Sequence, residues 1–220
     1  MVQASEGARR GRPRGGSDEK RQAVLRGART VFGREGYTRA GVDAIAAEAG
    51  VSSRTLYNHF GGKESLFRAV LLESAEAVTE AHRALFDRHF RKFREPYEDL
   101  LDLGLDWIRQ REVHPEHFAL VRQIIPEGPR LPADVLEEWQ RIGPRATQLS
   151  LRTHLLAVGQ EGRLAVDEGS ADRAARHLSL FLGGGVMLDS YYGALPLEPA
   201  AVEELVRDGV EVFLRLYGVE

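Results

Sequence analysis

The densest group of side chains that could bind another molecule lies in the stretch GVSSRTLYNHFGGKESLF, residues 50–67. Its glycines bracket hydroxyl, guanidinium, phenol, amide and imidazole groups, and a lysine follows them. Such groups donate hydrogen bonds to phosphate oxygens and read the edges of bases. The residues that carry this chemistry are Ser53, Arg54, Thr55, Tyr57, Asn58, His59 and Lys63. Their types predict contact with a nucleic acid if one helix face presents them.

The spacing of apolar residues predicts two short helices that would position these groups. Residues 42–49 have apolar side chains at the spacing of one helix face, and Gly50 suits the left-handed position that ends a helix. The second helix, capped by Ser52 or Ser53, would face the core with Leu56. Two short helices joined by a glycine-containing turn have the composition of a helix-turn-helix. The polar residues then lie opposite Leu56, on the exposed face.

A longer preceding helix is needed, because two short helices bury little apolar surface by themselves. Ser17 is expected to cap it, the apolar residues between Val24 and Phe32 share one face, and it should end near residues 33–36. Residues 1–16 are rich in glycine and arginine without apolar spacing, which predicts a disordered basic arm. The three segments together predict a helix-turn-helix domain over residues 17–62.

At these residues the sequence resembles the TetR family of bacterial transcription regulators. The resemblance runs from about residue 20 to residue 67 and rests on VFGREGY, VDAIAAEAG and VSSRTLYNHFGGKESLF. The last string is specific, since it fixes residue types at about ten positions within sixteen. The resemblance implies a DNA-binding domain followed by a helical domain that binds an effector and dimerises, over residues 63–220.

The resemblance also implies a role for each polar residue of the second short helix. The residues implied to enter the major groove are Ser53, Arg54 and Thr55. Tyr57 and His59 would hold the phosphate backbone, and Asn58 would lie near the base edges or the backbone. Lys63, at the start of the fourth helix, would meet a phosphate with the help of that helix N-terminus.

One position departs from the family pattern. TetR proteins usually have Ser or Thr directly before the valine that opens the second helix, and here this residue is Gly41. Glycine still serves as a cap, but the hydroxyl contact to phosphate is lost. Thr38 and Arg39 are both candidates to replace that contact.

The charge distribution supports a polyanion-binding N-terminal part. Residues 1–67 hold 12 of the 30 Lys and Arg and 7 of the 33 Asp and Glu, so they carry +5 and the remainder −8. Within this part, RRGRPRGG resembles an AT-hook, in which Arg10, Arg12 and Arg14 would enter a narrow minor groove. The alternative is a disordered basic tail that adds only electrostatic affinity.

The remaining chain has helical periodicity throughout, which predicts an all-α protein of about nine to ten helices. The expected segments are residues 63–94, as one helix or two; a helix opened by Pro96; residues 115–125; residues 132–158, kinked or divided at Pro144; a helix capped by Ser170; and a helix opened by Pro199. Residues 183–185 are three glycines within a helix, which predicts close approach of another helix.

The family resemblance implies that the last two long helices of each subunit form a homodimer interface. The segment RQIIPEGPRLP is also loosely similar to the C-terminal domains of efflux-type TetR regulators. Two recognition helices held about 34 to 36 Å apart would meet successive major grooves, which predicts a near-palindromic operator on double-stranded DNA. The resemblance further implies an effector pocket, whose candidate lining residues are Trp107, Phe118, Trp139, His154, Phe181 and Tyr191.

Enzymatic and membrane functions find little support. The pairs His114 and His117 or His82 and His89 lack a third ligand, and no GxSxG nucleophile motif or phosphate-loop lysine occurs. We therefore expect no catalytic site, no metal and no cofactor. The chain has no cysteine and no run of 18 apolar residues, so we expect a cytoplasmic protein without a membrane span.

Two functions remain open from the sequence. The first is a ligand-responsive transcriptional repressor that binds its operator as a homodimer and is released by a small-molecule effector. The second is an architectural protein that binds A·T-rich DNA broadly through the RGRPRG arm. The acidic, apolar C-terminal part favours the first function, because a packaging protein does not need that volume.

Overall fold

The computed structural model describes residues 15–219, and this part of the chain is all-α, as predicted. The helices are α1 (Gly15–Arg39), α2 (Val42–Glu48), α3 (Ser53–Phe60), α4 (Lys63–Phe90), α5 (Pro96–Val113), α6 (Pro115–Glu127), a 3-10 turn (Gly128–Arg130), α7 (Ala133–Ile142), α8 (Pro144–Gln160), α9 (Ala171–Asp189) and α10 (Pro199–Tyr217). None of these helices is long and apolar enough to cross a membrane.

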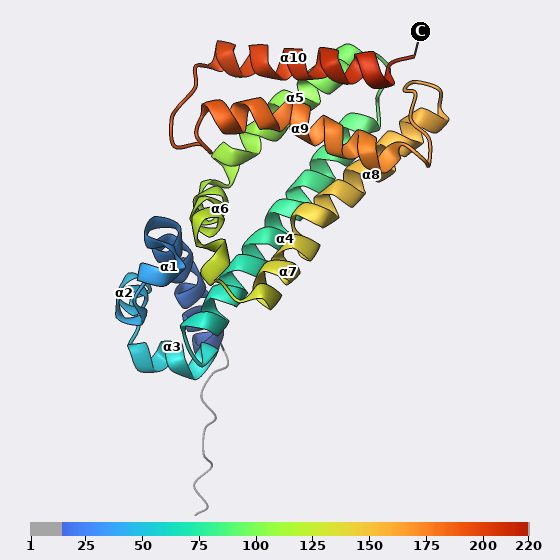
Figure 1. Ribbon diagram of the computed structural model, residues 1–220. Coiled ribbons are helices and arrows are strands. Elements are labelled where there is room, and N and C mark those ends of the chain that lie inside the picture. The colour runs from blue at the N-terminus through green and yellow to red at the C-terminus, as the bar shows by residue number, and fades with distance from the viewer. Residues whose placement is uncertain (1–14, 220) are drawn as a thin grey trace, which may run out of the picture.

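The long helix α4 connects the two ends of the molecule (Figure 1). Helices α1, α2 and α3 gather around its beginning, and α9 and α10 lie at the opposite end together with α5 and α8 (Figure 1). Two clusters of buried residues correspond to these ends. One cluster joins α1, α2, α3 and the first turns of α4 to α6 and α7, and the other joins the end of α4 to α5, α8, α9 and α10. The expected domain boundary at residues 62 and 63 therefore falls within one shared core.

Helix α1 differs from its prediction at its beginning. It already starts at Gly15, so Ser17 lies within the first turn and the prediction that Ser17 caps the helix is wrong. Glycine can adopt helical backbone angles, although its conformational entropy makes it a weak helix former. At the other end Gly36 has φ 79 and ψ 171, which interrupts the regular helix close to the predicted position. Residues 1–14, which contain most of the predicted arm, lie outside the described residues.

The local signals around the two short helices predicted their ends correctly. Gly50 and Gly61 have left-handed backbone angles, with φ of 65 and 75. Ser52, one of the two candidates, is the cap of α3, because its Oγ accepts a hydrogen bond of 3.2 Å from the backbone N–H of Thr55.

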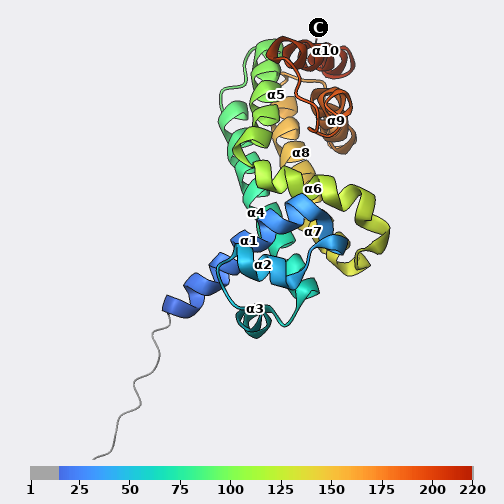
Figure 2. The same cartoon turned by 90° about the vertical axis from the view of Figure 1, so that its left-hand side faces the viewer.

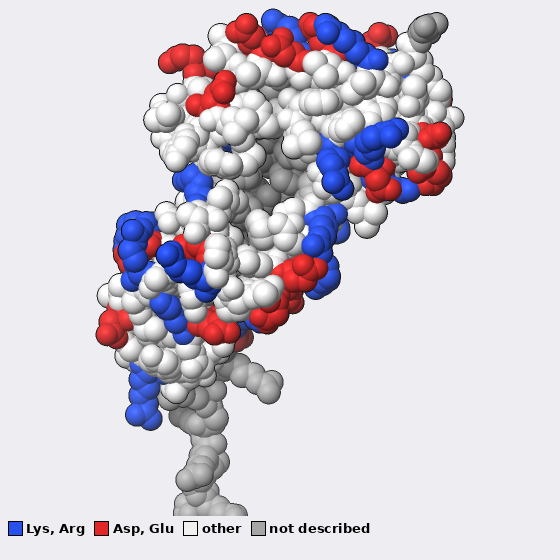
Figure 3. Space-filling view, viewed as in Figure 1, with Lys and Arg blue, Asp and Glu red and all other residues white. Residues whose placement is uncertain are grey.

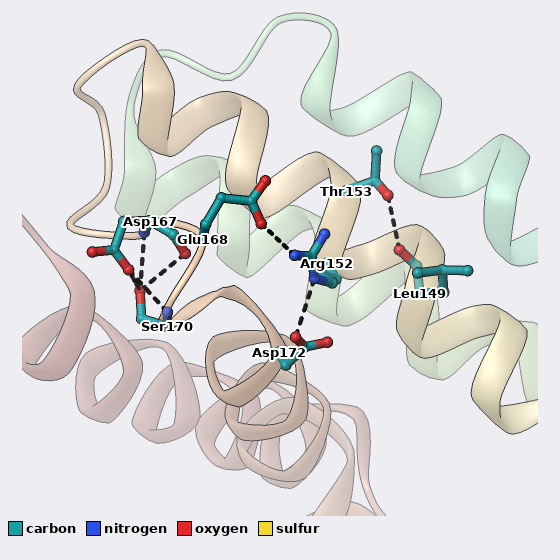
Figure 4. A network of polar contacts seen from close by, with 7 residues as sticks. All are labelled: Leu149, Arg152, Thr153, Asp167, Glu168, Ser170 and Asp172. Atoms are coloured by element: carbon teal, nitrogen blue, oxygen red, sulfur yellow. Dashed lines mark hydrogen bonds and ion pairs between the residues drawn. The ribbon is translucent and has the colours of Figure 1, made fainter.

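The later helices settle the alternatives that the sequence left open. Residues 63–90 form one helix, whereas Gly143, with φ −98 and ψ −99, separates α7 from α8. Helix α6 continues through Pro126 to Glu127, two residues further than predicted. Ser170 stands at the cap position of α9, but its hydroxyl bonds to Asp167 rather than to the helix (Figure 4). In the same network Arg152 of α8 pairs with Glu168 and Asp172, which joins α8 to α9 (Figure 4).

Close helix packing occurs at glycines that the sequence analysis did not single out. A Cβ on Gly209 would lie 2.2 Å from the carbonyl oxygen of Phe181, so α10 approaches α9 through this residue. A Cβ on Gly104 would lie 2.5 Å from Val206 Cγ1, which brings α5 close to α10. Gly183 and Gly184 meet nothing within 4 Å. Within the described chain, the predicted close approach occurs at Gly185, where a Cβ would lie 3.2 Å from Leu205 Cδ2 of α10, and does not occur at Gly183 or Gly184.

Candidate nucleic-acid interface

Helix α3 presents a polar face opposite a buried anchor. Leu56 is fully buried in the core that α3 shares with α1 and α4. Arg54, Tyr57 and Asn58 are exposed on the other side, with Tyr57 51% exposed. These three side chains make no hydrogen bond or ion pair with any other part of residues 15–219, so their polar groups are available for an external partner.

Two hydroxyls of the same helix are engaged inside the helix-turn-helix. Ser53 Oγ donates a hydrogen bond of 2.6 Å to the Asp43 carboxylate on α2. Thr55 Oγ1 lies 2.9 Å from Ser52 Oγ, the capping group of α3. The Ser53 contact fixes α3 relative to α2, and the Thr55 contact joins the first turn of α3 to its cap, so both residues help to orient the exposed face.

Lys63 holds the turn between α1 and α2. Its Nζ donates to the backbone oxygens of Thr38, at 3.3 Å, and Ala40, at 3.1 Å, and lies 4.8 Å from the centre of the Tyr37 ring. Because an ammonium has three donors, one N–H remains free for a phosphate. The phosphate contact of Lys63 stays a prediction, and the structure adds a positioning role that the sequence did not indicate.

The departure at Gly41 is visible as a missing side-chain cap. Gly41 precedes α2 with φ −94 and no side-chain hydrogen bond, and a Cβ there would meet nothing within 4 Å. Thr38 and Arg39 are both exposed nearby. Arg39 Nε donates to the Glu35 backbone oxygen at 2.9 Å, which leaves its two terminal nitrogens available. The arm residues Arg10, Arg12 and Arg14 lie outside the described residues.

The carboxylate of Glu127, at the end of α6, also binds the turn between α1 and α2. It accepts hydrogen bonds from the backbone N–H groups of Tyr37, at 2.6 Å, and Thr38, at 3.2 Å. A Cβ on Gly36 would lie 2.9 Å from Glu127 Oε1, so glycine is needed there for space as well as for its positive φ. The α1–α2 turn is thus held by α6 and by Lys63 of α4.

Helix α6 contacts both ends of the molecule through opposite faces. It lies beside α1 in both views (Figure 1, Figure 2). On one face Leu120 and Ile124 are buried in the core of the helix-turn-helix. On the other face Phe118, Val121 and Arg122 line a cavity of about 470 Å³. A movement of α6 would therefore change both the core of the helix-turn-helix and the cavity.

The cavity lies between α5, α6, the end of α9 and the segment that leads to α10. Its lining includes Ile108, Arg111, Phe118, Arg122, Met187 and Tyr192. Of the six predicted effector residues, this cavity contains only Phe118. The two arginines were not predicted from the sequence, because an arginine on an amphipathic helix is most often a surface residue.

The other five predicted effector residues are dispersed. Trp107 donates its Nε1–H to His82 Nε2 at 3.1 Å, and Trp139 packs against the N-terminal core. His154 Nε2 lies 2.9 Å from the Asp87 carboxylate, whereas Phe181 packs against the C-terminal core. Tyr191 is 70% exposed. These residues do not share one cavity with Phe118. Within residues 15–219 no three His, Cys, Asp or Glu side chains form a group that could hold a metal ion.

Comparison with known protein families covers both parts of the chain. The family of bacterial regulatory proteins named tetR matches residues 24–70. The C-terminal domain of AefR-like transcriptional repressors matches residues 98–219.

Similar individual proteins are also transcriptional regulators. The regulator UidR of Escherichia coli (strain K12) is 32% identical over 117 residues, which are 51% of this chain and 53% of UidR. The activator FasR of Mycolicibacterium smegmatis is 45% identical over 90 residues, 36% of this chain and 41% of FasR. The chain thus spans about half the length, or less, of these curated relatives in the matched regions.

Solved structures match over nearly the whole chain. A TetR-family transcriptional regulator from Mesorhizobium loti has a TM-score of 0.81 and 25% identity, covering 94% of this chain and 100% of that one. The flavonoid-responsive regulator FrrA has a TM-score of 0.66 and 28% identity, covering 91% and 98%. The chain therefore belongs to the TetR family of bacterial transcriptional regulators, which bind DNA through an N-terminal helix-turn-helix.

Proposed function

We propose that this protein is a ligand-responsive repressor that binds a near-palindromic operator as a homodimer and leaves it when a small molecule occupies the cavity. The observation that carries this proposal is the double contact of α6, with Phe118 in the cavity wall and Leu120 in the core of the helix-turn-helix. A ligand shifts such an equilibrium only if it binds one position of α6 more tightly than the other. The name of FrrA, which describes that protein as responsive to flavonoids, supports a small-molecule response.

An uncovered apolar surface on α9 and α10 supports the homodimer. Leu180 and Leu216 are 57% and 55% exposed, and Gly183 and Gly184 leave open space beside Leu180. In Figure 3 the surface over these two helices that faces the viewer is largely free of charge, whereas charged side chains line its upper edge. An apolar surface of this kind is typical of a protein interface. A second copy of the chain would supply the close helix approach that the glycines permit.

Replacing Leu180 by glutamate should convert the dimer into a monomer, because a charge buried in an apolar interface without a partner is strongly unfavourable. Sedimentation velocity at micromolar concentration would measure the change. Val113→Glu is the matched control, since Val113 is 62% exposed at the end of α5, on the side where it lines a pocket with Ser74 of α4 and His117 of α6. Equal dimerisation of the Leu180→Glu and Val113→Glu variants would place the interface elsewhere.

Selection of binding sites from a random DNA pool with the purified full-length protein tests the operator. Two half-sites about one helical turn apart, or a multiple of it, are expected for a dimer. Enrichment for A·T content alone would favour the architectural function.

Repression is tested by transcription from a promoter that overlaps the selected site. Loss of transcript supports a repressor. Gain of transcript would indicate an activator, as the name of FasR describes that relative.

Two substitutions separate base recognition from phosphate binding. Arg54→Ala should change the preferred bases at one position of each half-site, since a bidentate arginine contact contributes roughly 1–3 kcal/mol of discrimination. Lys63→Ala should weaken binding to every DNA sequence and lower the magnitude of the slope of log K against log salt by about 1. Lys92→Ala removes the same charge from an exposed position beyond α4 and serves as the control. Equal losses on every operator variant would contradict base reading by Arg54, and an unchanged slope would contradict a phosphate contact of Lys63.

A further inference from the structure

The cavity between α5, α6 and α9 is apolar over most of its wall. Ile108, Val121, Met187 and Leu197 contribute aliphatic or thioether surface, and Phe118 contributes an aromatic ring. A volume of about 470 Å³ lies within the range of pockets that bind small organic ligands. The wall therefore fits a ligand whose larger part is apolar.

Two arginines in this wall have no acidic partner. Neither Arg111 of α5 nor Arg122 of α6 forms an ion pair with any carboxylate among residues 15–219. By contrast, nearby arginines such as Arg109 and Arg88 pair with Asp106. The Arg111 guanidinium lies over the Phe118 ring, 5.9 Å from its centre, and both arginines are half-buried. Glu112 is the acidic residue of the lining, but it is exposed and contacts neither guanidinium as an ion pair.

The two positive charges affect each other. Burial lowers the pKa of Arg111, and the neighbouring charge of Arg122 lowers it further. Two guanidiniums that repel one another at the wall of an apolar cavity leave an uncompensated positive potential inside it. An anionic group placed between them would remove this repulsion and accept charge-assisted hydrogen bonds.

The segment between α9 and α10, which lines the cavity, has an unusual backbone. Tyr191, Tyr192 and Gly193 have φ of 47, 58 and 82, three left-handed residues in succession, although two of them are not glycine. Hydrogen bonds from Tyr192 N to Met187 O, at 2.6 Å, and from Leu195 N to Ser190 O, at 2.9 Å, hold this conformation. Tyr192 and Gly193 both line the cavity, beside Arg122. Strained backbone of this kind concentrates at ligand sites, where the surroundings over-determine it.

We propose that the cavity binds an anionic amphiphile, with its apolar part among the aliphatic side chains and its carboxylate or other anionic group between Arg111 and Arg122. This inference rests on the proposed function and specifies the effector's chemical class. Because one arginine belongs to α5 and the other to α6, the anionic group joins the two helices. The ligand thereby contacts α6, the helix that also packs against the core of the helix-turn-helix.

Isothermal titration of the full-length protein with decanoate and with decan-1-ol tests the proposal. Both probes have the same alkyl chain and fit the volume, but only decanoate carries a charge. We expect decanoate to bind at least tenfold more tightly than decan-1-ol. Equal affinities, a preference for the alcohol, or no binding of decanoate would overturn the proposal.

Variants assign the preference to the two arginines. Arg111→Gln together with Arg122→Gln should remove the tenfold preference and leave decan-1-ol binding within twofold. Arg109→Gln, on the same helix but outside the lining, should retain the preference. A preference that survives in the double variant would show that the charge of the ligand is read elsewhere. Circular dichroism confirms that each variant is folded.

Operator release separates this inference from the proposed function. If decanoate binds through the arginines but the operator complex persists, the ligand class is correct and the release mechanism is wrong. If a neutral compound releases the operator while decanoate does not bind, the protein is ligand-responsive and the anionic class is wrong.

Discussion

Lowering the pH from 7 to 5 should lower the free energy of unfolding by about 4 kcal/mol. Two histidines, His82 and His117, should each account for about 2 kcal/mol of this decrease. Burial lowers the pKa of His82 from 6.5 to about 4, with further contributions from His117 and His114. Burial likewise lowers the pKa of His117 to about 4, with contributions from His114 and Arg29. Both residues lie on elements that meet between the two cores, His82 on α4 and His117 on α6.

The sign follows from the proton balance. Between pH 6.5 and pH 4 the unfolded chain binds a proton on each of these histidines and the folded chain does not. The free energy of unfolding therefore falls as the pH decreases through this window, and changes no further on this account below about 4. Protonation of His82 at Nε2 would also remove the acceptor of the Trp107 indole N–H.

Urea denaturation at pH 7 and pH 5 measures the effect. The double variant His82→Gln and His117→Asn should lose most of the pH dependence, whereas His59→Gln, at a partly exposed position of α3, should reproduce the wild-type curve. The carboxyl groups of Asp134, bonded to Arg68, and Asp167, bonded to Ser170, have lowered pKa values and stay ionised throughout the window. An undiminished loss of stability in the double variant would assign the acid sensitivity to other groups.

The helix-turn-helix was predictable because its signals are local. Gly50 and Gly61 end α2 and α3 by their own conformational freedom, and Ser52 caps α3 through a residue three positions away. Leu56 indicates its buried face within a single helix turn. None of these features requires knowledge of a distant element, so sequence spacing is sufficient.

The cavity was not predictable in the same way, because its wall comes from α5, α6, α9 and the segment before α10. Choosing bulky residues by type led to Trp107 and Phe181, which pack into cores, since aromatic side chains contribute most when they are buried among other residues. Arg111 and Arg122 gain their significance only because they line one cavity and form no ion pair within residues 15–219, which spacing along the chain does not reveal.

Replacing Glu127 by alanine should lower the free energy of unfolding by about 3 kcal/mol, and should also weaken operator binding tenfold or more. The carboxylate accepts backbone hydrogen bonds from Tyr37 and Thr38, and hydrogen bonds to charged groups contribute roughly 1.5–3 kcal/mol each. Without Glu127, the turn that places α2 and α3 keeps the hydrogen bonds from Lys63 and the packing of the Tyr37 ring against Phe67 of α4. Urea denaturation and fluorescence anisotropy with the selected operator measure the two effects.

The same substitution tests how the cavity reaches the DNA. Glu127→Gln keeps one acceptor oxygen and should retain part of the stability. Glu116→Ala removes a carboxylate from the same helix, but its ion pair with Arg29 is 3.7 Å long and its side chain is 57% exposed, so it should change stability by less than about 1 kcal/mol. If ligand still binds the Glu127→Ala variant but releases the operator less effectively than it does from the Glu116→Ala control, the carboxylate transmits the movement of α6 to the α1–α2 turn. If release is equal in both variants, the transmission runs through the packing of Leu120 and Ile124 against α1, and Glu127 serves stability alone.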